Sequence, residues 1–338
     1  MNFLLLLPFL LSFILAFNGM PKWIKKCNQT KFLWEDMNKF KHPKNVASSG
    51  GFVVIVSFIL GVLSYIAIRT FLIKPSSIFI TTEIFGVISV ISIISIVGLT
   101  DDFLGWKKKG LSKRFRLFFA FLASVPLVVI NAGTSFVNVP FLGMINLGIL
   151  YPLLIIPIGV AGASLTFNFL AGFNGLEAGQ GIIILSTLSI VAYLTGSPWL
   201  LMVGITMIIP LLVFLYFNKY PAKVFPGDSL TLSVGALIAC MAILGNFERL
   251  ALFIFIPYII ETALKTRGKL KKQSFGKPNK DGSLSMPYDK IYGLTHLSIF
   301  LIKKLKGKVY EKEVTSLIWM FQIIICLIAL IMFWLGVF

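Results

Sequence analysis

Long apolar runs separated by short polar connections make up almost the whole chain. A helix that crosses a bilayer needs about 20 mainly apolar residues, and somewhat fewer where polar ends reach the interface. The chain has ten runs that meet or approach this length, of which the sixth is the shortest. We therefore predict an all-α integral membrane protein of about ten transmembrane helices, at residues 2–18, 50–73, 82–99, 115–131, 148–166, 181–195, 199–217, 229–246, 249–264 and 314–337.

Composition supports a membrane protein, and the distribution of charge predicts its orientation. The chain is 57% hydrophobic and has a mean hydropathy of +0.91, which is unusual for a soluble protein. Its net charge of +18 would by itself allow a nucleic-acid partner. However, four polar segments carry 28 of the 31 basic residues, at 18–49, 100–116, 218–228 and 265–312. Because basic loops stay in the cytoplasm, we expect these segments inside, both termini outside, and no nucleic acid.

The remaining pattern argues for one polytopic domain over residues 1–338, with the cytoplasmic loop 265–312 inside it. That loop is too long for a simple connector, so we expect it to be functional or partly folded. Residues 132–146 alternate apolar and polar positions around Pro140 and Gly143, which predicts a short external β-hairpin. The three cysteines and two histidines lack the spacing of a disulfide framework or a metal cluster.

The polar stretch FNFLAGFNGLEAGQG, at residues 167–181, is the strongest functional signal in the chain. Polar side chains at membrane depth are costly and usually mark a functional site. Asn168, Asn174 and Glu177 lie here together, and Gly172 lets the backbone leave the helix and approach a ligand. The alternative is a helix-packing patch of small residues, but packing does not account for the three polar side chains.

Three aspartates are predicted to lie at the same cytoplasmic depth as that stretch. Asp101 and Asp102 follow the third run, and Asp228 precedes the eighth. Adjacent carboxylates serve as metal ligands or general bases, although charges next to Lys107–Lys109 are also typical of a solvated surface. Asp228 follows a Pro-Gly turn, where capping the next helix is a sufficient structural role. Functionally, a helix start attracts phosphate, and Asn168 with Asp228 would suit a Mg²⁺ ion that also binds phosphates.

Further candidate binding residues come from the polar loops. Phe225, just before the Pro-Gly turn, is placed either to stack on a base or to anchor at the membrane interface. Lys271, Lys272 and Lys277 in the last loop are placed to clamp an anionic substrate, although positive-inside charge explains each of them more simply. The residues alone thus predict a cytoplasm-facing site suited to Mg²⁺ and phosphate. Phosphoryl transfer between a cytosolic nucleotide and a lipid fits such a site.

Five stretches spread over nearly the whole chain carry a resemblance to a known family. They are DMNK at 36–39, GLTDDFLGW at 98–106, FNFLAGFNGLEAGQ at 167–180, YPAKVFPGDSL at 220–230 and GSLSMPY at 282–288. In them the chain resembles the polyprenyl-phosphate N-acetylhexosamine-1-phosphate transferases. It is most similar to their eukaryotic and archaeal branch, the UDP-N-acetylglucosamine–dolichyl-phosphate N-acetylglucosaminephosphotransferases. The NGLEAG and FPGD stretches are highly specific together, whereas the DD pair alone is weak.

The resemblance implies a ten-span fold with outward termini, which agrees with the topology predicted from charge. It implies transfer of N-acetylglucosamine 1-phosphate from UDP-N-acetylglucosamine to dolichyl phosphate, with release of UMP. This reaction makes GlcNAc-PP-dolichol and is the first step of lipid-linked oligosaccharide assembly for N-glycosylation. The implied cofactor is Mg²⁺, or Mn²⁺ in its place.

The resemblance also implies roles for residues that match the family's motifs. Asn168 and Asp228 would hold the metal ion on the pyrophosphate. Phe225 would stack on uracil, with Gly172 and Asn174 near the uridine.

The DD pair and a following basic residue are implied to act on the phosphates. Asp101 and Asp102 would lie near the metal ion and the lipid phosphate, where one of them is a candidate general base. Lys113 and Arg116 both fit the basic residue that binds phosphate after this pair, and the spacing does not decide between them.

Two departures from the family's pattern make the sugar less certain than the reaction type. Leu165 stands where an Asn is usual, and KLKKQSFGK in the last loop lacks the His/Arg motif that holds the sugar. Another UDP-N-acetylhexosamine or polyprenyl phosphate is therefore the alternative within the family. A membrane transporter or flippase is the alternative from another class, although the chain shows no second broken-helix repeat. Short external loops favour an archaeal cell membrane over an endoplasmic reticulum, and a homodimer stays open.

Overall fold

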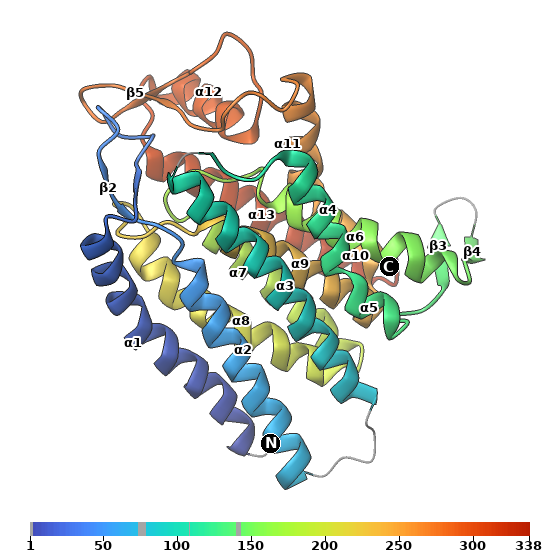
Figure 1. Ribbon diagram of the computed structural model, residues 1–338. Helices are drawn as coiled ribbons and strands as arrows, with labels where there is room; N and C mark the ends of the chain where they lie inside the picture. Colours follow the sequence, from blue (N-terminus) through green and yellow to red (C-terminus); the bar gives the residue numbers. More distant parts are fainter. Residues whose placement is uncertain (1–2, 74–78, 108, 140–142) are drawn as a thin grey trace.

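The computed structural model describes residues 3–73, 79–107, 109–139 and 143–338 as a bundle of long helices with loops and short strands gathered at one end (Figure 1). Within these residues, seven helices are long and apolar enough to cross a membrane. They are α1 (Leu7–Thr30), α2 (Gly51–Ile68), α3 (Phe79–Lys107), α7 (Leu176–Leu194), α8 (Pro198–Asn218), α9 (Gly227–Gly245) and α13 (Glu311–Trp334). The prediction of a mainly α-helical integral membrane protein is confirmed.

The other helical segments are short. They are the 3₁₀ turn η1 (Phe3–Leu6), the π-helical segments η2 (Arg69–Ile73) and η3 (Tyr151–Ile155), and the helices α4 (Lys113–Ala123), α5 (Val125–Val129), α6 (Ile156–Phe167), α10 (Glu248–Ile254), α11 (Ile256–Arg267) and α12 (Leu294–Lys306).

Two predicted spans are interrupted helices. The run at 115–131 forms α4 and α5, and the run at 249–264 forms α10 and α11. In each pair the second helix has a proline in its first turn, Pro126 or Pro257. Proline lacks a backbone N–H and is favoured in the first turn of a helix, so each of these prolines lies where a new helix begins. The count of ten spans stays a prediction, because only seven helices qualify individually within the described residues.

Helix α9 is the centre of the bundle. All its residues from Ser229 to Leu244 are buried, and it packs against α2, α3, α6 and α7. Gly98 on α3 faces the start of α9 so closely that a Cβ there would lie 2.5 Å from the backbone nitrogen of Ser229. Small residues allow membrane helices to approach this closely. The end of α3 and the start of α9 are therefore fixed against each other.

Three antiparallel strand pairs connect the helices. They are β1 (Leu33–Glu35) with β2 (Lys44–Ala47), β3 (Phe136–Val139) with β4 (Gly143–Asn146), and β5 (Lys277–Pro278) with β6 (Leu284–Ser285). The pair β3–β4 lies where the sequence predicts a hairpin, and Phe136 stands opposite Asn146. Pro140 of the predicted turn lies outside the described residues, and the external position of this pair stays a prediction.

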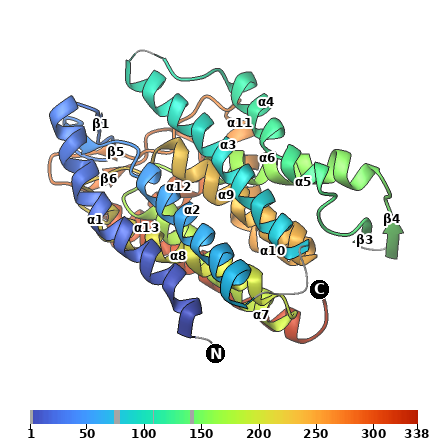
Figure 2. The ribbon, with the colours of Figure 1, turned by 60° about the horizontal axis from the view of Figure 1, so that its bottom comes forward.

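The basic segments meet at one end of the bundle, which we call the loop end. Strands β2 and β5 and helix α12 lie there, whereas the N terminus lies at the opposite end (Figure 1). In Figure 2, which brings that opposite end forward, the C terminus also lies away from the loop end. Lys113, at the start of α4, donates a hydrogen bond to the carbonyl of Leu270 at 2.7 Å and so joins two of these segments.

Candidate active site

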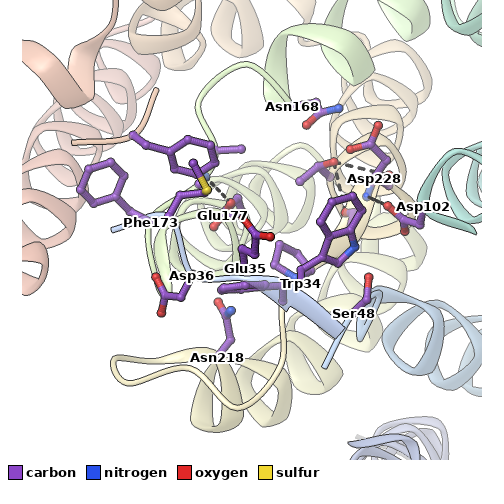
Figure 3. Close-up of a pocket in the computed structure, with 18 of the residues that line it drawn as sticks. Trp34, Glu35, Asp36, Ser48, Asp102, Asn168, Phe173, Glu177, Asn218 and Asp228 are labelled. Carbon is purple, nitrogen blue, oxygen red and sulfur yellow. Dashed lines mark hydrogen bonds between the residues drawn. The ribbon is translucent and has the colours of Figure 1, made fainter. Parts of the chain in front are cut away.

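A cavity of about 450 Å³ lies at the loop end, between the end of α3, the start of α9, strand β1 and the segment that joins α6 to α7 (Figure 3). Six of the predicted site residues line it, namely Asp102, Asn168, Gly172, Glu177, Phe225 and Asp228. The fold thus brings together residues from three widely separated parts of the chain. This gathering is the basis for a candidate active site.

Asp102 holds the start of α9 in place. Its Oδ1 accepts a hydrogen bond from the backbone N–H of Asp228 at 2.8 Å. Its Oδ2 accepts from the Ser49 hydroxyl at 2.8 Å and from the backbone N–H of Ser229 at 3.4 Å. The first N–H groups of a helix have no partner within it, and a carboxylate there is favourable. Capping of α9, the structural alternative for Asp228, is therefore wrong, because Pro226 is the N-cap residue and a carboxylate from α3 satisfies the N–H groups.

Gly227 makes this close approach feasible. Its φ angle is +70°, which favours glycine, and a Cβ at this position would overlap the carboxylate of Asp102. The following residue, Asp228, has a side chain that is 22% exposed and lines the cavity. Asp228 and Asn168 are neighbours along one side of the cavity in Figure 3.

Arg116, on helix α4, is the cation that lies beside the carboxylates of Asp101 and Asp228. The Nη1 atom of Arg116 lies 2.9 Å from Oδ2 of Asp228 and 3.2 Å from Oδ2 of Asp101. Lys113 instead donates its hydrogen bond to the carbonyl of Leu270 in the last loop. Where spacing left two candidates, the structure places Arg116, and not Lys113, beside the carboxylates.

The segment between α6 and α7 is shaped by backbone contacts. Gly172 and Gly175 have φ angles of +108° and +84°, which other residues rarely adopt. Oε1 of Glu177 accepts a hydrogen bond from the N–H of Gly172 at 2.7 Å, and Asn218 accepts one from the N–H of Gly175 at 3.0 Å. Within the described residues, Oε2 of Glu177 is buried without a hydrogen-bond partner. Glu177 therefore orients the segment while it lines the cavity.

Asn174 does not line the cavity and instead contacts a polar cluster that sequence reasoning missed. Its N–H donates to Oε1 of Glu311 at 2.8 Å, and its side chain donates to Asp36 at 3.5 Å. Asn38 donates to the carbonyl of Gly172 at 2.8 Å. Asp36 and Asn38 belong to the DMNK stretch, whose polar residues look like ordinary loop residues, and Glu311 looks like an ordinary acid at a helix start. This cluster holds the segment between α6 and α7 in place through hydrogen bonds to its backbone.

The three candidate lysines of the last loop do not line this cavity. Lys271 is exposed, and Lys277 borders two separate hollows on the loop surface. Lys272 lies over the ring of Tyr288, with Nζ 4.6 Å from its centroid. Lys44 on β2 lines the cavity instead. The sequence did not indicate this role, because Lys44 is one of many lysines in the loops.

Strand β1 contributes a wall of the cavity that the sequence did not predict. Trp34, Glu35 and the following Asp36 line it (Figure 3). The predicted Phe225 also lines the cavity. Phe225 is partly buried, and its N–H donates to the carbonyl of Ala47 at 2.8 Å. An aromatic pair at the cavity could bind a flat ring, because bases stack on aromatic side chains.

The donor set fits Mg²⁺ bound jointly by protein and phosphate. Asn168 and Asp228 offer an amide oxygen and a carboxylate oxygen to the cavity. Among the described residues, no group of three or more His, Cys, Asp or Glu side chains fits a metal ion held by protein alone. Mg²⁺ usually takes one or two carboxylates plus substrate phosphates and water, so these two residues suffice.

Known proteins are similar to this chain over most of its length. Residues 84–246 match the profile of glycosyl transferase family 4. A putative UDP-N-acetylglucosamine–dolichyl-phosphate N-acetylglucosaminephosphotransferase of Saccharolobus solfataricus is 34% identical over 332 residues, which cover 97% of this chain and 96% of that protein. A protein of the same name from Sulfolobus acidocaldarius is 31% identical over 96% of each chain. A probable undecaprenyl-phosphate N-acetylglucosaminyl 1-phosphate transferase of Bacillus subtilis is 28% identical over 87% of this chain and 81% of its own.

Proposed function

Because the chain belongs to glycosyl transferase family 4, we propose that it transfers N-acetylglucosamine 1-phosphate from UDP-N-acetylglucosamine to dolichyl phosphate. An oxygen of the lipid phosphate attacks the phosphorus that carries the sugar. The bond from that phosphorus to the bridging oxygen breaks, UMP leaves, and GlcNAc-PP-dolichol forms. One observation carries the proposal: Asn168 and Asp228 line one cavity and Arg116 is paired with Asp228, in a chain 34% identical over 97% of its length to a relative named for this reaction.

We assign the roles of the residues around the cavity from their charges and from the negative charge of the phosphates. Phosphoryl transfer needs mainly positioning and neutralisation of charge. Arg116, beside Asp101 and Asp228, offers a guanidinium group where phosphates approach. When bound at Asn168 and Asp228, Mg²⁺ would neutralise the pyrophosphate. Phe225 and Gly172 would bind the uridine.

Asp102 is assigned to positioning rather than to proton transfer. Its two oxygens accept three hydrogen bonds, two of them from the start of α9 and one from Ser49. Through these bonds Asp102 fixes the helix turn that carries Asp228. No base is required for the attack, because a phosphate monoester is already anionic near neutral pH.

The proposed location is an archaeal cell membrane, with the cavity on the cytoplasmic side. Two relatives that match over nearly their whole length are archaeal, and the loop end that holds the cavity carries most of the basic residues.

UMP release by purified protein tests the reaction directly. The assay contains dolichyl phosphate, Mg²⁺ and one UDP-sugar from a panel. Release with UDP-N-acetylglucosamine, and only when the lipid is present, is the expected result. Release with another UDP-sugar would move the specificity and keep the reaction. Uridine nucleotide binding without release from any sugar would contradict the transferase and favour a transporter.

An Asp228→Asn variant tests the assigned site within that reaction. The change keeps the shape of the side chain but removes its charge, so turnover is expected to fall by about 100-fold or more. Asp281→Asn is the matched control, because Asp281 is an exposed loop carboxylate paired with Lys308. Substantial turnover by a folded Asp228→Asn protein would contradict the metal and phosphate assignment.

A further inference from the structure

The last loop contributes a wall to the cavity, which we define as residues 273–276. Its first and third residues line the cavity. The ring of Phe275 lies so close to Gly172 that a Cβ on Gly172 would be 2.6 Å from it. The N–H of Gly276 donates to Oδ1 of Asn38 at 3.0 Å, and Asn38 in turn donates to the carbonyl of Gly172. One end of the wall is therefore fixed to the segment between α6 and α7.

Lys265, in the last turn of α11, holds the other end of the wall. Its Nζ donates to the Ser274 hydroxyl at 2.7 Å, and that hydroxyl donates to the backbone carbonyl of Phe169 at 3.3 Å. Nζ also lies 5.8 Å from the ring centroid of Phe169. Phe169 directly follows Asn168 in the chain. One ammonium group thus connects the wall with the residue next to the candidate metal ligand.

Glu261, one turn earlier on α11, holds Lys265 in turn. Its side chain is fully buried, and its Oε1 lies 3.7 Å from Nζ of Lys265. Its Oε2 accepts a hydrogen bond from the N–H of Leu294 at 2.5 Å, at the start of α12. Gly293 leaves room for this carboxylate, because a Cβ there would lie 2.9 Å from Oε1. The ion pair therefore joins α11 to α12 beneath the wall.

Stability alone is a weak reason for such a pair. Removing two charges from water is expensive, and a buried ion pair is often no more stabilising than apolar residues of the same volume. The side chain of Lys265 is only 14% exposed, whereas Lys271 and Lys277 in the same loop are exposed. Lys265 donates to Ser274, whose two neighbours in the chain line the cavity. This contact points to a role of the pair at the cavity.

We propose that Lys265 is a positioning residue of the active site, which sets the 273–276 wall against the backbone of Phe169, next to Asn168, through the hydroxyl of Ser274. This inference rests on the proposed function, because it takes the cavity as the nucleotide-sugar site. Lys265 touches neither substrate nor metal and acts through its neighbours. Outer partners of metal ligands change metal affinity or activity by about 10–100-fold when they are removed.

Four variants separate this role from a general effect on charge. Lys265→Met keeps the length of the side chain without its charge, and Lys265→Arg keeps a cationic donor. Ser274→Ala removes the connecting hydroxyl. Lys280→Met is the matched control, because it removes one charge from an exposed position of the same loop.

Steady-state kinetics give the first readout. Lys265→Met and Ser274→Ala are expected to raise the KM for UDP-N-acetylglucosamine, and the Mg²⁺ concentration at half-maximal rate, by about tenfold. Lys265→Arg should recover part of this loss, and Lys280→Met should stay within about twofold of wild type. The double variant of Lys265 and Ser274 should be no worse than the poorer single variant, because both changes break the same connection. Multiplied effects in the double variant would overturn the inference.

Hydrogen exchange of the metal-free protein gives a second readout, independent of turnover. Lys265→Met is expected to speed amide exchange in the peptide that covers residues 169–172 and to leave α9 unchanged. Wild-type exchange there, or loss of thermal stability with wild-type KM and Mg²⁺ dependence, would overturn the inference. If the wild type binds UDP-N-acetylglucosamine with Mg²⁺ but releases no UMP, the proposed function fails. The binding affinities of the same variants then decide the positioning role, and equal affinities would overturn it.

Discussion

At the scale of single residues, Arg116 is the cation that compensates the negative charge of the site aspartates. It compensates Asp228 and Asp101 at once, and its loss leaves uncompensated negative charge where phosphates must approach. We expect Arg116→Met to lower kcat/KM for UMP release by about 100-fold or more. Lys113→Met removes the same charge three positions away, where the side chain binds Leu270 in the last loop. Its effect should be within about fivefold, and a larger loss for Lys113→Met than for Arg116→Met would contradict the assignment.

His296, in the last loop, is expected to give a pH dependence of stability. The residue is fully buried in α12, and burial lowers its pKa from 6.5 to about 4. Between these values the unfolded chain binds a proton that the folded protein does not bind. The contribution of His296 to stability should therefore fall as the pH decreases from 6.5 towards 4, by about 3 kcal/mol in total, and stay constant above this window.

Thermal unfolding in detergent between pH 7.5 and pH 4.5 measures this dependence. Relative to the midpoint temperature of His296→Gln, that of the wild type should fall as the pH decreases below about 6.5. His296→Gln cannot take up the proton, so its midpoint should fall less steeply over the same range. Equal slopes for the two proteins would show that other groups cause the pH dependence.

Residue chemistry in the sequence was informative only where it contrasted with its surroundings. Asn168 and Glu177 stand among apolar residues, so their polarity predicted a site, and both line the cavity. Glu311 and Asp36 could not be recognised in this way, because acids are ordinary in loops and at helix starts. Their importance comes from contacts with Asn174, which lies far away in sequence. Such contacts depend on how the helices pack, and the sequence pattern does not contain that packing.

At the scale of elements, the contact between α3 and α9 positions the aspartates. The helices approach closely at Gly98, because a Cβ there would lie 2.6 Å from the backbone carbonyl oxygen of Asp228. Gly98→Ala should separate the helices, break the hydrogen bonds of Asp102, and destabilise the protein by about 1–3 kcal/mol. Turnover should fall further than stability alone explains. The measurement is UMP release at a temperature where the variant is still folded.

Gly162 on α6 offers a control for this helix contact. No atom lies within 4 Å of a Cβ at Gly162, so Gly162→Ala should be neutral or slightly stabilising. If Gly98→Ala behaves like Gly162→Ala, the close approach of α3 and α9 does not position the site.

The helices were largely predictable from the length of the apolar runs. The interruptions of the runs at 115–131 and 249–264 both lie at a proline. Apolar length alone treats 115–131 and 249–264 as continuous, yet Pro126 and Pro257 each begin a new helix. These prolines were visible in the sequence. The sequence did not show that β1 lines the cavity. A three-residue strand in a long basic loop has neither the length nor the alternation of a recognisable strand.

At the scale of the whole molecule, the fold and the charge distribution indicate the same orientation. The cavity lies at the loop end, and the segments that carry most of the basic residues meet there. A nucleotide sugar is made in the cytosol and cannot cross a bilayer, so its site must face the basic side. Residues near β4 and residues near β5 should therefore lie on opposite sides of the membrane.

Labelling with a membrane-impermeant maleimide tests this orientation. The three native cysteines are buried, so an introduced exposed cysteine should dominate the signal. Met144, on β4, is 77% exposed, and Lys280, after β5, is exposed as well. Right-side-out vesicles should label Met144→Cys but not Lys280→Cys, and inverted vesicles should show the reverse. A cysteine appended after Phe338 should label with Met144→Cys, because ten crossings place both termini outside. Its labelling with Lys280→Cys would place the C terminus on the same side as the last basic loop and would contradict the ten-span topology.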